Sequence, residues 1–241
     1  MTTINKEEIQ KFSSLAEEWW DVNGKFKPLH MFNPVRIEYI LDIVCSHFNL
    51  DRKKNLPLKK LKILDIGCGG GLISEPMCRL GAEVTGIDAS EKNIKIASIH
   101  AKKNKLNIKY LNKSPEQIGE KENYDIILNL EVVEHVNDLN LYLSSCFNLL
   151  NKNGLMFTAT INRTFTSYVK AIIGAEYVLR WLPIGTHDWN KFLKPEELET
   201  KLTKLNFFIK DIKGLSFNPL LGKWKKSKDL SVNYIMTVKK N

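Results

Sequence analysis

Residues 64–71 read LDIGCGGG, and residues 84–88 read VTGID. Together they predict a strand, a glycine turn, a helix and a second strand that ends on Asp88. Gly67 and Gly69 allow the backbone to bend tightly and to approach a ligand without side chains in the way. Asp88 is spaced to bind a pair of ribose hydroxyls. The two stretches therefore predict a binding site for a nucleoside cofactor.

The residues of this turn distinguish between classes of nucleoside cofactor. A dinucleotide site needs a third glycine or alanine so that helix and strand pack closely, and this chain has Leu72 there. Asp65 also places a carboxylate where it would repel a pyrophosphate. A carboxylate suits a cationic cofactor, and the pattern resembles motif I of S-adenosylmethionine-dependent methyltransferases, whose ligand carries a sulfonium and an ammonium group. We favour this class over a dinucleotide-binding protein, and both over a turn without a ligand.

Around the turn, apolar strands alternate with helical patterns, as in a doubly wound α/β sheet. A further helix and two late strands are expected to complete the seven-stranded, mostly parallel sheet of a Rossmann-like class I methyltransferase. The expected strands are residues 61–66, 83–87, 108–111, 125–130, 155–161, 207–212 and 232–238, and the expected helices are 71–80, 91–104, 138–150 and 195–205.

The chain of 241 residues, 43% of them hydrophobic, is long enough for one large α/β core. We expect a single methyltransferase domain, residues 1–241, built from four parts. They are an N-terminal helical extension (1–60), a cofactor-binding core (61–161), a lid or membrane-facing insertion (162–194), and a C-terminal helix with a strand pair (195–241).

Composition narrows the possible partners and compartment. The net charge is +9, but the lysines are spread along the chain and only Lys223–Lys228 forms a patch. Because such a run is more often a solvated loop, we expect no nucleic-acid partner. Four scattered cysteines fit a reducing compartment. The polar amino terminus and the lack of a membrane-length apolar stretch predict a cytoplasmic protein.

Two segments outside the expected sheet are distinctive. In the extension, Asn33 and Pro34 suggest a helix cap and first turn, which would place Arg36 one turn into a helix. There Arg36 could bind a carboxylate such as the methionine end of the cofactor, or it could be a surface arginine. In the insertion, residues 168–182 form an apolar helical pattern that is too short to span a bilayer. It suits a buried lid helix or a helix in a membrane interface.

The chemistry is expected at the end of the fourth strand, because ligands of open parallel sheets bind beyond the carboxyl ends of the strands. Glu131, Glu134 and His135 would share one face if a helical turn began here. Two carboxylates and an imidazole can bind a divalent cation. Alternatively, the carboxylates stabilise a helix start and His135 packs under the sheet. The polar-Pro-Pro-aromatic motif of base-modifying methyltransferases is absent, so nucleic-acid bases are not expected as substrates.

Several blocks spread over nearly the whole chain resemble the ubiquinone-biosynthesis O-methyltransferase family. The blocks Phe26–His30 and Gly185–Asp188 narrow the resemblance from superfamily to family. The resemblance implies methylation of phenolic hydroxyls on polyprenylated catechol-type and demethylubiquinol intermediates, at two steps, with S-adenosylhomocysteine as the other product. The other matching blocks are Trp19–Asp21, Asn33–Arg36, Asp65–Gly71, Glu131–His135 and Gly174–Tyr177.

The resemblance also implies which residues bind the cofactor. The family's contacts fall on Arg36, Gly67, Asp88 and Leu130, and the expected set is completed by Cys68, Gly69, Ala89 and Glu116. One departure concerns the adenine. Many class I enzymes read Asp-Ala-Glu after the third strand, whereas this chain reads Ser114-Pro115-Glu116, and Pro115 has no N–H to donate.

The expected mechanism is in-line attack of a catechol oxygen on the sulfonium methyl. A magnesium or zinc ion at Glu131, Glu134 and His135 would lower the phenol pKa. Alternatively, His135 or His187 is a general base.

Because a polyprenyl tail lies in the bilayer, we expect peripheral association with the inner face of the membrane through residues 162–190. Other ubiquinone-biosynthesis enzymes are possible partners. The alternatives are a related small-molecule O- or C-methyltransferase with another phenolic or quinol acceptor, and a cofactor-binding protein without activity.

Overall fold

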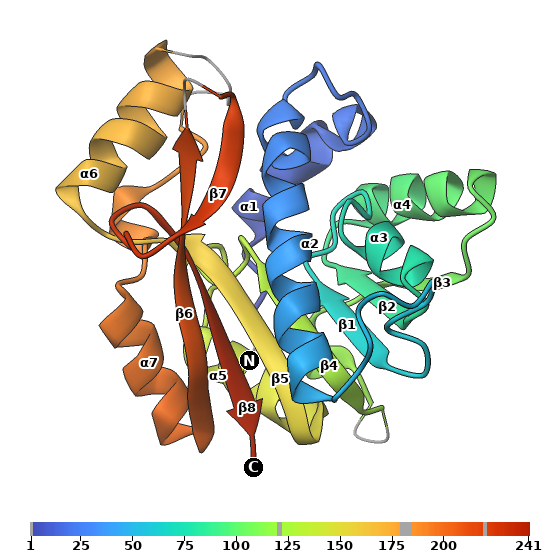
Figure 1. Cartoon of the computed structure of the whole chain (residues 1–241). Coiled ribbons are helices and arrows are strands. Elements are labelled where there is room, and N and C mark those ends of the chain that lie inside the picture. The colour runs from blue at the N-terminus through green and yellow to red at the C-terminus, as the bar shows by residue number, and fades with distance from the viewer. Residues whose placement is uncertain (1, 120–121, 179–184, 219–220) are drawn as a thin grey trace.

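The computed structural model describes residues 2–119, 122–178, 185–218 and 221–241. Its centre is one sheet in the order β3-β2-β1-β4-β5-β8-β6-β7, in which β1 to β5 are parallel and the last three strands are antiparallel (Figure 1). The strands are β1 Lys62–Ile66, β2 Glu83–Asp88, β3 Ile108–Asn112, β4 Tyr124–Leu130, β5 Leu150–Ile161, β6 Phe207–Asn218, β7 Lys223–Ser227 and β8 Asn233–Lys240.

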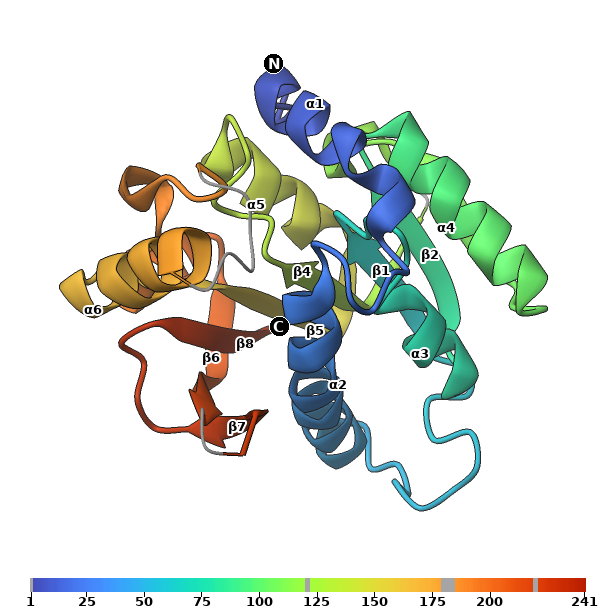
Figure 2. The same ribbon diagram turned by 90° about the horizontal axis from the view of Figure 1, so that it is seen from above.

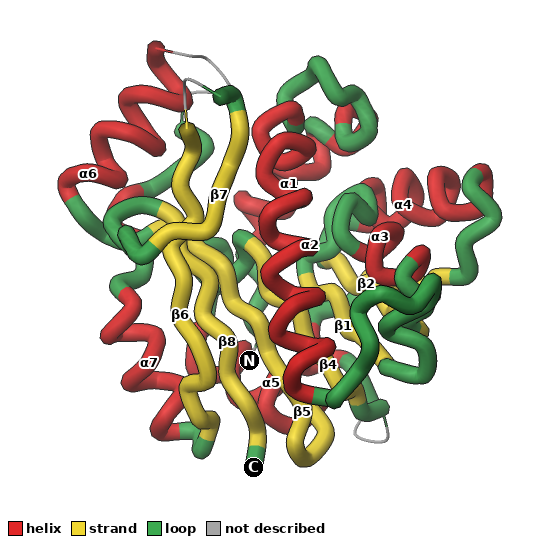
Figure 3. Tube along the Cα trace, in the orientation of Figure 1, coloured by secondary structure: helices red, strands yellow, loops and turns green. Residues whose placement is uncertain are grey.

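Helices cover both faces of the sheet, as Figures 2 and 3 show. They are α1 Lys6–Ser14, η1 Ala16–Glu18, α2 Lys27–His47, α3 Ser74–Arg79, α4 Glu91–Lys103, η2 Pro115–Gln117, α5 Leu139–Leu149, α6 Phe165–Ser167, η3 Tyr168–Val178, η4 Trp189–Lys191 and α7 Pro195–Lys204. Within the described part of the chain, no helix is both long and apolar enough to cross a membrane.

The core forms two layers because successive side chains of a strand point to opposite faces. Ile63 of β1 is buried with residues of α2 and α3, whereas its neighbour Leu64 is buried with residues of α5 and α7. Ile126 and Ile127 of β4 divide in the same way. The α/β fold expected from the sequence is therefore confirmed.

The sheet has eight strands in the described residues, so the expected count of seven is wrong. The additional strand is β7, in the lysine-rich run that we interpreted as a solvated loop. It pairs with the end of β6, and Trp224 packs against Phe32 with the ring centroids 4.1 Å apart. The lysines hid this strand because an edge strand exposes alternate side chains to solvent.

The start of the arginine-bearing helix was also wrong. Helix α2 begins at Lys27, with Pro28 in its first turn, and Pro34 lies inside the helix rather than at its start. Arg36 is thus more than two turns into α2. Burial of Phe32 and Val35 in the core explains why the helix continues through Pro34, since packing outweighs local propensity.

Candidate functional site

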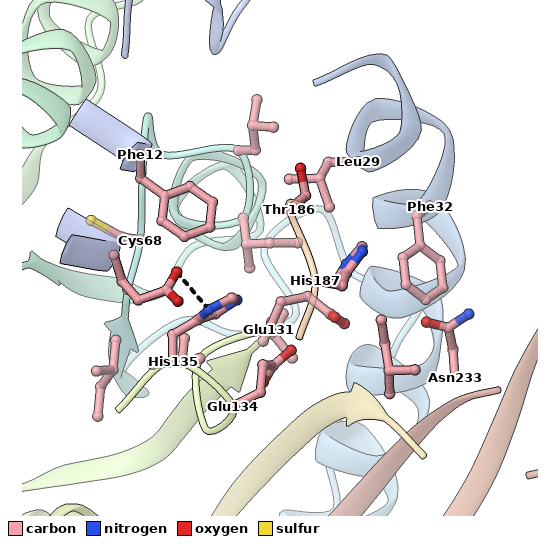
Figure 4. Close-up of a pocket in the computed structure, with 18 of the residues that line it drawn as sticks. Phe12, Leu29, Phe32, Cys68, Glu131, Glu134, His135, Thr186, His187 and Asn233 are labelled. Atoms are coloured by element: carbon pink, nitrogen blue, oxygen red, sulfur yellow. Dashed lines mark ion pairs between the residues drawn. The ribbon is translucent and has the colours of Figure 1, made fainter. Parts of the chain in front are cut away.

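One cavity of about 820 Å³ lies beyond the carboxyl ends of β1, β2 and β4. Its walls come from α1, α2, the loops that follow these strands, and the insertion between β5 and α7. Seen from above in Figure 2, α1 lies across this end of the sheet. Figure 4 shows Phe12 of α1 on one side of the cavity and Phe32 of α2 on the other. The cavity is large enough for a cofactor and an acceptor together.

The glycine turn approaches its neighbours so closely that side chains are excluded. Gly67 and Gly69 have φ values of 65° and 54°, where glycine is favoured. A Cβ on Gly69 would lie 2.4 Å from the ring of Trp19, and a Cβ on Gly67 would lie 2.6 Å from Val132. The Trp19 indole is fixed by a 2.9 Å hydrogen bond that it donates to Asn93. The N-terminal extension therefore packs directly on the turn.

Asp88 ends β2 and holds the loops around it together. Its carboxylate accepts hydrogen bonds from the backbone N–H of Gly69 at 2.9 Å, from the backbone N–H of Ser90 at 2.8 Å and from the Asn93 amide at 3.2 Å. Burial raises the pKa of Asp88, while these hydrogen bonds oppose the rise. The carboxylate lines the cavity together with Ala89.

Asp65 is a second buried carboxyl group at the cavity. It is 3% exposed and accepts a 2.6 Å hydrogen bond from the Ser74 hydroxyl. Burial, with a smaller contribution from the charge of Asp88, raises the pKa of Asp65 to about 7. A cationic ligand would favour its charged form.

Arg36 is almost completely buried, at 2% exposure, and faces the same cavity from α2. Its guanidinium forms an ion pair with Glu131 and lies 3.7 Å from the centre of the Phe32 ring. Burial lowers the pKa of Arg36, and the charges of Glu131 and Glu134 oppose this. Its Nε has no hydrogen-bond partner among the described residues. Arg36 therefore has unused capacity to bind an anionic group.

The segment after β4 is a turn, not the helical turn that we expected. Glu131 has a φ of 58°, so the three predicted metal ligands do not share a helix face. Glu131 pairs with Arg36, and Nδ1 of His135 lies 3.1 Å from the carboxylate of Glu8. Within the described residues, no group of three His, Cys, Asp or Glu side chains is arranged to hold a metal ion.

Glu134 is buried and lines the cavity beside His135 (Figure 4). Burial and the neighbouring charge of Glu131 raise the pKa of Glu134 to about 7. Arg36 therefore forms an ion pair with Glu131, and its charge is also close enough to interact with that of Glu134.

His187 reaches the cavity from the part of the insertion between η3 and η4 (Figure 4). Its Nδ1 lies 2.9 Å from the carboxylate of Glu176, which also accepts hydrogen bonds from the backbone N–H groups of Gly185 and His187. The two sequence blocks 174–177 and 185–188 thus meet through one carboxylate. Residues 179–182 of the expected apolar helix lie outside the described residues.

Most, but not all, of the predicted cofactor-binding residues line the cavity. Arg36, Gly67, Cys68, Asp88, Ala89 and Leu130 line the cavity. Gly69 supports the turn instead. The Glu116 carboxylate accepts two hydrogen bonds from Thr3, at 2.9 and 2.7 Å, and so holds the N-terminus.

Sequence reasoning missed the contribution of α1 to the site. Glu8 approaches His135 and forms a 3.0 Å ion pair with Lys191. Lys11 donates hydrogen bonds to the carbonyl oxygens of Gly185 and Thr186. Asn5, which caps α1, was the available sequence signal for a helix here, but nothing in the sequence indicates where that helix packs.

Comparison with known proteins adds close relatives. The chain is 58% identical to the ubiquinone biosynthesis O-methyltransferase of Pelagibacter ubique, over 100% of both chains. It is 52% identical to the protein of the same name from Bartonella tribocorum, over 100% of this chain and 98% of that one. The family described as methyltransferase domain matches residues 64–158.

Solved structures share the fold. Magnesium protoporphyrin IX methyltransferase from Synechocystis, with bound S-adenosylmethionine, has a TM-score of 0.66 and 16% identity over 100% of both chains. A possible histamine N-methyltransferase from Thermotoga maritima has a TM-score of 0.64 and 17% identity, over 98% of this chain and 99% of that one. At such identities the likeness extends to the fold alone.

Proposed function

This chain belongs to the ubiquinone biosynthesis O-methyltransferase family, and we propose that it methylates phenolic hydroxyls of polyprenylated catechol and demethylubiquinol acceptors at both O-methylation steps. It is an S-adenosylmethionine-dependent O-methyltransferase of ubiquinone biosynthesis, as its relatives and its methyltransferase domain indicate. The observation that carries the proposal is the identity of 58% and 52% to these two relatives over 100% of this chain.

The cofactor end of the cavity fits S-adenosylmethionine. Asp88 would bind the ribose hydroxyls, and Arg36 would bind the methionine carboxylate with its unpartnered Nε. Gly67 lines the cavity, where a residue without a side chain allows a ligand to approach the backbone. When bound, S-adenosylmethionine supplies an electrophilic methyl group on a sulfonium. Asp65 stabilises positive charge at this end of the cavity.

The acceptor end combines apolar walls with groups that can move a proton. Phe12, Phe32 and Trp224 line it and exclude water from the reacting oxygen. His135 or His187 accepts the phenol proton, since a neutral imidazole is a suitable base near neutral pH. A positioned general base contributes about 10²–10⁴-fold to rate. The proton therefore moves to a histidine as the oxygen becomes a nucleophile.

A requirement for magnesium or zinc stays a prediction. The carboxylates of Glu131 and Glu134 are chemically suited to such an ion, but Glu131 would first have to leave Arg36. Binding of the cofactor carboxylate by Arg36 would release Glu131.

Methyl transfer from labelled S-adenosylmethionine to a short-tailed demethylubiquinol tests the proposed reaction. The purified protein is assayed after chelation, with and without added magnesium or zinc. Transfer in either case supports the proposal, and dependence on added metal supports the carboxylate site. If the cofactor binds but the quinol is not methylated, the acceptor is wrong, and a soluble phenol becomes the next substrate to test.

We expect the insertion to meet the membrane. Phe165 is 79% exposed, and Tyr168, Val169, Ile173 and Tyr177 are also exposed along α6 and η3. Figure 1 shows this helix at the periphery of the molecule. Apolar and aromatic side chains on an exposed helix are suited to the interfacial layer of a bilayer, where a polyprenyl tail emerges.

Co-sedimentation with vesicles that contain anionic lipid tests this contact. Substitution of Phe165, Ile173 and Tyr177 by serine should abolish sedimentation while S-adenosylmethionine still binds. Ile99 of α4, which is 56% exposed, is replaced by serine as the matched control. Equal sedimentation of the triple variant and the control would rule out the contact.

A further inference from the structure

The buried carboxylate of Glu176 binds the backbone and the side chain of the segment that carries His187. Glu176 lies on η3 of the insertion and is only 1% exposed. A buried carboxylate is costly unless it is hydrogen-bonded. Here one oxygen accepts from the Gly185 N–H at 2.7 Å, and the other faces both the backbone N–H and the Nδ1 of His187 at 2.9 Å.

This arrangement determines which ring nitrogen of His187 carries the proton. Burial alone would raise the pKa of Glu176, but the hydrogen bonds from His187 and Gly185 lower it, so the side chain is ionised. An ionised carboxylate only accepts hydrogen bonds. The Nδ1 of His187 must therefore carry the hydrogen, which leaves Nε2 as the basic nitrogen of the neutral ring.

The other histidine of the cavity is held differently. Nδ1 of His135 and the nearest Glu8 oxygen lie 3.1 Å apart, but neither atom has a hydrogen-bond partner with acceptable geometry among the described residues. Glu8 is also shared with Lys191. Of the two carboxylate–histidine pairs, the Glu176–His187 pair thus has the better defined geometry.

We propose that Glu176 is a positioning residue for methyl transfer: it holds His187 in the tautomer protonated on Nδ1, so that Nε2 accepts the proton of the acceptor hydroxyl. This inference rests on the proposed O-methylation. The bond between Nε2 and hydrogen forms as the phenolic O–H bond breaks, and Nδ1 keeps its proton, so the imidazolium that results is stabilised by the Glu176 carboxylate. The blocks 174–177 and 185–188 then act as one unit.

Replacement of Glu176 by glutamine tests the proposal with little change in shape. Glutamine has one acceptor oxygen for three donors, and its NH₂ group can donate to Nδ1, which favours the wrong tautomer. We expect Glu176→Gln to lower kcat about 10-fold or more and His187→Gln to lower it about 100-fold. The KM for S-adenosylmethionine should change less than about twofold, because the cofactor residues are untouched. The matched control is Glu199→Gln on α7, an exposed site that should leave kcat unchanged.

The double variant separates positioning from a structural role. If Glu176 acts through His187, the variant with both substitutions should be no slower than His187→Gln alone. Effects that multiply would overturn the proposal. A loss of kcat in Glu8→Gln, without a loss in Glu176→Gln, would also overturn it and would assign the base to His135.

Nitrogen NMR of ¹⁵N-histidine-labelled protein reads the tautomer without any acceptor. The chain has five histidines, and the spectrum of His187→Gln identifies the signals of His187. We expect hydrogen on Nδ1 in the unmodified protein and a shift toward Nε2–H in Glu176→Gln. An Nε2–H tautomer in the unmodified protein would overturn the proposal. If the quinol is not methylated, the proposed function fails, but the spectrum still decides whether Glu176 sets the tautomer.

Discussion

The two ends of the cavity are built in different ways. The cofactor end is formed mainly by one continuous stretch, residues 65–89, whose turn conformation and buried carboxylates come from nearby residues. The acceptor end is assembled from α1, the turn after β4, the insertion and the hairpin of β6 and β7. Its polar contacts join residues more than 100 positions apart, such as Glu8 with His135 and Lys191. The geometry of the cofactor end therefore depends on the local backbone conformation. The geometry of the acceptor end depends on how distant segments of the chain pack against one another.

The largest effect should follow a change in backbone shape at the cofactor end. We expect Gly69→Ala to lower the free energy of unfolding by about 2–6 kcal/mol, because a positive φ and a clash with Trp19 both oppose the methyl group. Urea unfolding measures this loss. Gly119→Ala is the control, since no atom lies within 4 Å of the Cβ it would add. Equal stability of the two variants would show that neither the positive φ of Gly69 nor its contact with Trp19 excludes a side chain.

Asp65 should produce a smaller effect of opposite sign. Its pKa is about 7 in the folded protein against 3.8 in the unfolded chain, so the unfolded chain loses its proton first as pH rises. Stability therefore falls between these two pH values, and the penalty is complete above pH 7. Asp65→Asn should be about 1–3 kcal/mol more stable than the unmodified protein at about pH 8, with no difference below about pH 4.

Urea unfolding at both pH values checks this expectation, with Asp51→Asn on an exposed loop as the control. The same substitution should weaken the binding of S-adenosylmethionine, since a carboxylate for a cation is lost. A variant that is no more stable at high pH would mean that folding does not raise the pKa of Asp65.

The packing of α1 at the acceptor end should depend on its ion pairs. Glu8→Ala removes contacts with His135 and Lys191, and we expect it to cost about 1 kcal/mol because these pairs are partly exposed. Trypsin should then cleave after Lys6 and Lys11 faster than in the unmodified protein. Glu7→Ala, which changes an exposed neighbour, should not have this effect. Cleavage of Glu8→Ala at the original rate would show that α1 docks without these ion pairs.

The smallest effect is expected at the edge strand β7. Lys226 pairs with Asp42 at 2.9 Å and Glu38 at 3.5 Å, but all three side chains are a third or more exposed. Such pairs contribute at most about 1 kcal/mol, so Lys226→Ala should barely change the urea midpoint. Lys225→Ala on the same strand is the control. A larger loss for Lys226→Ala would mean that β7 is held by charge and not by Trp224.

Sequence reasoning succeeded where a pattern is local and failed where contacts are distant. The five parallel strands follow from short apolar runs, and the turn at residues 67–71 follows from its glycines. The start of α2 was wrong because the packing of Phe32 and Val35 carries the helix through Pro34. Strand β7 was missed because its pairing with β6 and the contact of Trp224 with Phe32 are invisible in a lysine-rich run.

The candidate site divides in the same way. Residue types and spacing were enough to indicate a nucleoside pocket with Asp88 and to suggest Arg36 as a carboxylate ligand, and the resemblance to the family added Leu130. The placement of Glu8 beside His135 required the fold, because the two residues are 127 positions apart. The turn at Glu131 also replaced the expected helix face, since its backbone there is left-handed.

By itself, the sequence determined the cofactor class and the order of the elements, because glycine conformation, strand periodicity and a terminal carboxylate act over a few residues. Only the tertiary structure decided how the acceptor end is assembled. Arg36 is paired with Glu131, and Glu176 is paired with His187, because burial requires each charged group to find a partner wherever the chain brings one within reach.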